Sequence, residues 1–126
     1  MKRLALALIA SIWAMAAMAA GPEITFDTTA HDCGTIRADK GAVSWTYRFT
    51  NTGDEPLVII SVSNGGCGCT KPAFPAQPVA PGQSGEIKIT FNPEGRRGQL
   101  DRKVKVRTNA SSKPVMLSFN GMIIPK

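Results

Sequence analysis

The sequence contains few of the residues that most enzymes use for chemistry, with one histidine and three cysteines among 126 residues. A Ser-His-Asp triad is not readable, because His31 stands alone and no nucleophile motif accompanies it. Asp32, Glu94 and Asp101 are scattered among predicted turns and show no paired-carboxylate pattern. The glycine-rich "NGGCG", residues 64–68, lacks the Lys-Ser/Thr pair and the helix of a phosphate-binding loop. The sequence therefore predicts a protein that is not an enzyme and that uses no cofactor.

A sustained helical period and internal repeats are also absent. Hydrophobic and polar residues instead alternate over short stretches, as in residues 43–51, where Trp45, Tyr47 and Phe49 share one face of a half-buried strand. Residues 57–63, "LVIISVS", are apolar on both faces and are predicted to form a central strand. We predict an all-β fold, an immunoglobulin-like antiparallel β-sandwich of about seven strands.

Apart from residues 4–20, no long hydrophobic run is present. This run follows Lys2 and Arg3 and ends in the small residues around Ala19, a pattern typical of a cleaved secretory signal. We expect residues 1–19 to be a signal peptide and residues 20–126 to form one Ig-like domain without a transmembrane segment. The predicted location is outside the cytoplasm, either periplasmic or secreted.

The charge of the chain is only mildly basic, at +6 for the full sequence and about +4 without the predicted signal peptide. Such a charge is too small to indicate nucleic-acid binding. The strongest basic feature is the predicted surface formed by Arg102, Lys103, Lys105 and Arg107. It could meet an acidic partner, but such a row more often keeps a sheet soluble and protects its edge.

Three cysteines, Cys33, Cys67 and Cys69, give an odd number of thiols. In an oxidising compartment all three are disulfide candidates, and the remaining thiol could join a second copy of the chain in a dimer. A Cys67–Cys69 bond needs a bend at Gly68 and would be easily reduced. Pairing of Cys33 with Cys67 or Cys69 would instead attach the long irregular segment 64–82 to the first strand.

Two further interpretations of these cysteines stay open. The thiols could be buried and inert, packing as small apolar groups. They could also bind a soft metal such as Cu(I) or Zn(II), with Cys67, Cys69, Cys33 and His31 as the candidate ligands. The spacing of Cys67 and Cys69 suits both a bent disulfide and two thiolate ligands of one metal. We favour a disulfide of some pairing and predict no metal site.

Several motifs together resemble the family known as domain of unknown function 1573 (DUF1573). They are "HDCGTI", "FTNTGDEPLVI", "CGCTKP", "PVAPGQSGEIKITFNP", "RRG" and a final "NG". The resemblance covers about residues 24–124 and implies a secreted bacterial Ig-like sandwich of the hydin and abnormal-spindle type. It implies no activity. It also implies that Cys67 and Cys69 belong to the family pattern, whereas Cys33 stands where the family usually carries a phenylalanine.

These observations predict an exported, non-enzymatic binding or assembly module. Its partner would be a protein or another component of the cell envelope. The alternative is a periplasmic protein that handles thiols or a soft metal through Cys67-Gly68-Cys69.

Overall fold

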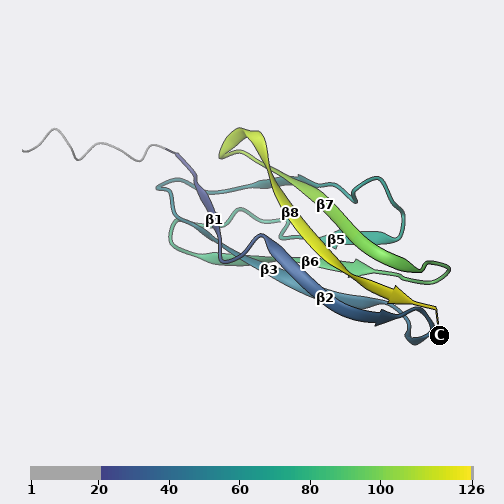
Figure 1. The fold of residues 1–126 in the computed structure, drawn as a ribbon. Coiled ribbons are helices and arrows are strands. Elements are labelled where there is room, and N and C mark those ends of the chain that lie inside the picture. Colours follow the sequence, from purple (N-terminus) through teal and green to yellow (C-terminus); the bar gives the residue numbers. More distant parts are fainter. Residues whose placement is uncertain (1–20, 126) are drawn as a thin grey trace, which may run out of the picture.

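The chain forms two β-sheets packed face to face, as Figure 1 shows for a computed structural model that describes residues 21–125. The predicted signal peptide, residues 1–19, lies outside the described residues. One sheet has the order β1-β3-β6-β5 and the other β2-β8-β7-β4. The strands are β1 (Ile24–Phe26), β2 (Ala30–Arg37), β3 (Val43–Asn51), β4 (Ile59–Val62), β5 (Thr70–Ala73), β6 (Ser84–Phe91), β7 (Gly98–Thr108) and β8 (Ser111–Ile124). This two-layer arrangement confirms the predicted Ig-like sandwich.

The core lies between the two sheets, where the alternating residues meet. Tyr47 and Phe49 of β3 are fully buried, as predicted. Phe119 of β8 crosses the space between the layers, with its ring centroid 4.9 Å from that of Trp45 and 6.1 Å from that of Phe91. Aromatic contacts thus join the sheets directly, as expected for a sandwich without an inter-sheet disulfide.

Three details of the predicted strand arrangement were wrong. The four residues of β5, which pair with β6, lie within the segment 64–82 that we expected to be irregular. The strand β2 pairs parallel with β8, so the sandwich is not wholly antiparallel. The strand β4 lies at the edge of its sheet beside β7, not in the centre, and its Ile60 is 59% exposed. An apolar run cannot distinguish a central strand from an edge strand with one exposed hydrophobic residue.

A buried asparagine holds one end of the sandwich together. Asn51 is completely buried, and its Nδ2 donates to the carbonyl oxygens of Glu55 at 2.7 Å and Val79 at 2.9 Å. Its Oδ1 accepts hydrogen bonds from the amides of Gly53 at 2.9 Å and Glu23 at 3.4 Å. All four polar positions of the side chain are therefore used, as a buried amide requires.

Candidate functional site

The Cys67–Cys69 pair lies on a loop that is held against β7. The Asn64 side chain accepts a hydrogen bond from the Gly66 amide at 2.8 Å, which closes a tight turn. Gly65 has a φ of +71°, and a Cβ atom there would lie 2.9 Å from the carbonyl oxygen of Lys103. Only glycine fits this conformation and this close approach. The loop therefore presents Cys67 and Cys69 in a defined position.

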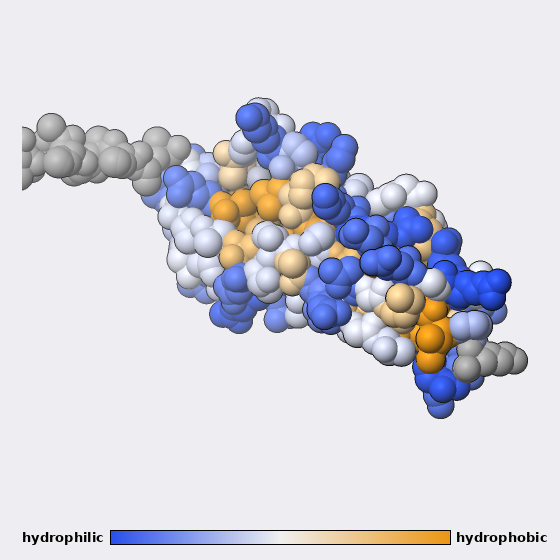
Figure 2. Space-filling view, viewed as in Figure 1, coloured by the Kyte–Doolittle hydropathy of each residue, from blue (hydrophilic) through white to orange (hydrophobic). Residues whose placement is uncertain are grey.

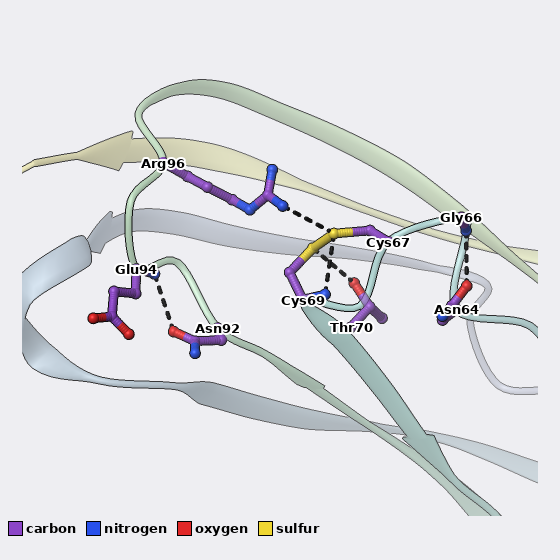
Figure 3. The surroundings of a disulfide bond; sticks show 8 residues. All are labelled: Asn64, Gly66, Cys67, Cys69, Thr70, Asn92, Glu94 and Arg96. Carbon is purple, nitrogen blue, oxygen red and sulfur yellow. Dashed lines mark hydrogen bonds between the residues drawn. A yellow bond between two sulfur atoms is a disulfide. The ribbon is translucent and has the colours of Figure 1, made fainter.

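In the structure, Cys67 and Cys69 are joined by a disulfide, with their Cα atoms 5.2 Å apart (Figure 3). The carbonyl of Cys67 accepts a hydrogen bond from the Thr70 amide at 3.2 Å, and that of Cys69 accepts one from Asn92 at 2.8 Å. The second bond ties the loop to the end of β6. Because Cys67 and Cys69 are joined to each other, neither a Cys33–Cys67 nor a Cys33–Cys69 disulfide is formed in this structure.

Arg96 lies beside the disulfide and was not identified from the sequence as part of this site. Its Nη2 donates to the sulfur of Cys67 at 3.1 Å, and the backbone amide of Cys69 donates to the same sulfur at 3.1 Å (Figure 3). Arg96 comes from the turn between β6 and β7, and no sequence pattern links that turn to residues 64–69. The two segments meet because β5, which follows the cysteines, pairs with β6.

The two sulfur atoms have different surroundings. Cys67 is 8% exposed, whereas Cys69 is half-buried. Cys69 also borders a surface hollow of about 250 Å³ that includes Lys71 and Thr90. A positive group thus lies against the sulfur of the buried residue Cys67, and the more exposed residue, Cys69, borders an open hollow.

Cys33 is a free thiol among the described residues and lies on β2, half-buried. Burial raises the pKa of this thiol, and the nearby Asp32 carboxylate raises it further. A raised pKa leaves less thiolate at neutral pH, and the thiolate is the reactive form.

We expect iodoacetamide to alkylate Cys33 several-fold more slowly in the folded protein than in the urea-unfolded protein at neutral pH. The alkylation rate of the unfolded protein should reach a plateau as the pH rises. The rate of the folded protein should keep rising beyond that pH, because the pKa of Cys33 is higher in the folded state. Mass spectrometry of samples quenched between about pH 6 and about pH 11 measures both rates. A plateau reached at the same pH in the folded and the unfolded protein would contradict the raised pKa.

The candidate metal ligands do not come together in the structure. His31 stacks on Trp45, with ring centroids 4.8 Å apart and planes 8° from parallel. Within residues 21–125, no three side chains of His, Cys, Asp or Glu form a group that could hold a metal ion. His31 therefore lies in a packing contact at the sandwich edge.

The predicted basic surface divides between two faces of β7. Lys103, Lys105 and Arg107 are exposed on the outward face. Arg102 alternates with them, on the side of β7 that carries the buried Val104. Lys103 and Lys105 line a hollow of about 360 Å³ together with Met116, Ser63, Gly65 and Gly66. The outward face thus combines positive charge with an exposed hydrophobic side chain.

The strand β8 has a free edge in its first half. The β2–β8 pairing begins at Ser118, so Val115, Met116 and Leu117 pair with β7 on one side and have no described strand on the other. The β7–β8 register shifts before them, between Ser111 and Val115. The Ser118 amide donates to the Thr29 carbonyl at 2.7 Å, on the β2 side. Because backbone groups alternate along a strand, the N–H and C=O of Met116 point to that same side, where no strand lies.

Hydrophobic surface accompanies this free edge. Figure 2 shows an apolar area over β1 and the first part of β8, separated by hydrophilic residues from a second apolar area near the end of β8. Ile24 and Phe26 of β1 and Val115 of β8 are partly buried residues at this margin of the core. Met116 is 41% exposed. A free backbone edge therefore lies next to incompletely covered hydrophobic side chains.

No helix within residues 21–125 is long and apolar enough to cross a membrane. No curated protein matches the chain. Among solved structures, a protein of unknown function from Porphyromonas gingivalis W83 is 16% identical, with a TM-score of 0.70 over 88% of this chain and 51% of that protein. The chain thus spans about half the length of that protein.

Two further structures have similar folds. The ASH/PapD-like domain 7 of human CEP192 is 11% identical, with a TM-score of 0.61 over 82% of this chain and 86% of that domain. The Pseudomonas aeruginosa CupB2 chaperone is 14% identical, with a TM-score of 0.52 over 79% of this chain and 55% of the chaperone. At these identities the likeness shows the fold. The family model described as "Protein of unknown function (DUF1573)" matches residues 24–123, and the chain therefore belongs to the DUF1573 family.

Proposed function

We propose that this chain is an exported, non-enzymatic module that binds an extended segment of a partner protein by strand addition. The observation that carries the proposal is the free edge of β8 at residues 115–117 beside an apolar area. An added strand would gain main-chain hydrogen bonds at that edge and bury alternate side chains against the margin of the core. Export is part of the proposal and is supported by the basic start and the apolar run predicted to be a signal peptide.

The chemistry of this edge favours one kind of partner. Pro114 has no N–H to donate, which limits unspecific pairing of this stretch with other sheets, while the N–H and C=O of Met116 face the free edge. Inward side chains of the added strand would contact apolar residues such as Phe26 and Val115. Lys103 and Lys105 give the adjacent outward face a positive potential. We therefore propose a partner segment with alternating apolar residues and acidic residues close by.

Photo-crosslinking tests this proposal with a matched control. A benzophenone side chain at Met116 should form covalent adducts with a protein of defined mass in cells of the source organism. The same group at Met122 should form none, because Met122 has similar exposure on the same strand but pairs with Thr35 of β2. Equal labelling at both positions, or none at Met116, would refute binding at the free edge.

A backbone variant separates strand addition from side-chain contact. Met116→Pro removes an N–H that points away from β7, so it should weaken partner binding at least about tenfold. Met116→Leu keeps this N–H and should bind within about twofold of the wild type. Circular dichroism of both variants checks that the sandwich is intact.

A further inference from the structure

The disulfide described above has a feature that binding at β8 does not explain. The guanidinium of Arg96 and the amide of Cys69 both donate to the sulfur of Cys67, at 3.1 Å each. A disulfide sulfur is a weak acceptor and gains little from two donors. A thiolate at the same position would gain much more, because one of the donors carries a full positive charge. The surroundings of Cys67 therefore suit its reduced, ionised form.

We propose that the Cys67–Cys69 disulfide is a thiol-exchange site that oxidises dithiols of other exported proteins. A substrate thiolate attacks the sulfur of Cys69 and forms a mixed disulfide, while the electron pair of the broken bond leaves on the sulfur of Cys67. The second thiolate of the substrate then attacks the substrate sulfur of the mixed disulfide. The substrate disulfide is released, and Cys69 leaves as a thiolate that takes up a proton.

In this reaction the substrate dithiol loses two electrons, and the cysteine pair gains them. The pair returns to its oxidised form by exchange with a more oxidising disulfide, either on another protein or on a small molecule such as oxidised glutathione. This inference uses residues separate from the β8 edge and does not depend on the proposed function.

Cys69 is the sulfur that is attacked, and Cys67 is the leaving group. Cys69 borders an open hollow, so an incoming thiolate can approach it, and Lys71 in that hollow attracts the negative charge. Cys67 is almost completely buried, which protects its sulfur from attack. It is also the better leaving group, because Arg96 stabilises the thiolate that forms there.

The direction of electron flow follows from the same contact. A group that stabilises the reduced state of a cysteine pair makes the corresponding disulfide a stronger oxidant. Arg96 contacts the pair from the surface, so solvent screens part of its effect. We expect its contribution to be about tenfold in the equilibrium constant with glutathione, equivalent to about 30 mV for a two-electron couple.

The test uses the mature protein with Cys33→Ser, so that Cys67 and Cys69 are the thiols measured. The protein is incubated with reduced and oxidised glutathione, quenched with acid and mapped by mass spectrometry. We expect reduction without denaturant and a transient glutathione adduct on Cys69. Arg96→Gln should shift the equilibrium about tenfold towards the disulfide and slow its reduction. Arg97→Gln, which changes the neighbouring exposed arginine, should behave as the parent protein.

Three results would overturn the inference. The first is a disulfide that resists about 10 mM reduced glutathione in the folded protein, a cytosol-like excess of thiol. The second is a glutathione adduct on Cys67 in place of Cys69. The third is equal behaviour of the Arg96→Gln and Arg97→Gln variants. Mapping the glutathione adduct in the Cys33→Ser protein shows which cysteine is attacked. This result does not require the Arg96 or Arg97 variant to fold.

Discussion

Replacing Asn51 with alanine is expected to lower the free energy of unfolding by about 3 kcal/mol. The substitution removes both donors and both acceptor positions of a completely buried amide. The Glu55 carbonyl and the Gly53 amide lose partners that the surrounding chain cannot replace. Urea denaturation followed by circular dichroism measures the change.

Thr50→Ala is the matched control, because Thr50 precedes Asn51 on β3 and faces the other way. Its Oγ1 shares an exposed hydrogen bond with Ser84 at 2.9 Å. This substitution should cost about 0.5 kcal/mol or less. Similar losses for Asn51→Ala and Thr50→Ala would show that the buried network does not hold this end of the sandwich together.

Replacing Phe119 with alanine should lower the free energy of unfolding by about 4 kcal/mol. Phe119 is completely buried and contacts Trp45 and Phe91 of the opposite sheet. Its loss leaves a cavity between two rigid layers, and neither sheet can collapse into that space without breaking its own hydrogen bonds. Thermal and chemical unfolding of the variant measure the loss.

Met122→Ala provides the comparison on the same strand. Met122 is 47% exposed on the outer face of β8, so its truncation should cost less than about 0.5 kcal/mol. A small effect of Phe119→Ala, close to that of Met122→Ala, would contradict the role of Phe119 as the contact between the sheets.

The two proposed sites can be separated in one set of measurements. Met116→Pro should weaken partner binding at the free edge of β8 at least about tenfold and leave the glutathione equilibrium unchanged. Arg96→Gln should change that equilibrium and leave the crosslinks in place. The hollow lined by Met116, Gly65 and Gly66 places the disulfide loop near the partner edge. A partner held at that edge could exchange with the disulfide only if it carries a thiol that reaches Cys69.

The sequence by itself determined the fold class, the family resemblance and most of the core. Alternation in residues 43–51 identified Tyr47 and Phe49 as buried, because every second side chain of a strand points to the same face of the sheet. The close spacing of Cys67 and Cys69 singled out the loop that carries the disulfide. These features are local, so a single stretch of chain is enough to reveal them.

The tertiary structure alone decided how the strands pair and which loops meet. Strand pairing depends on contacts between residues far apart in the sequence, which local periodicity does not record. For this reason the edge position of β4, the parallel β2–β8 pair and the free edge of β8 became visible only in the structure. Arg96 and Cys67 are 29 residues apart in the sequence. They come into contact because the pairing of β5 with β6 brings their two loops together.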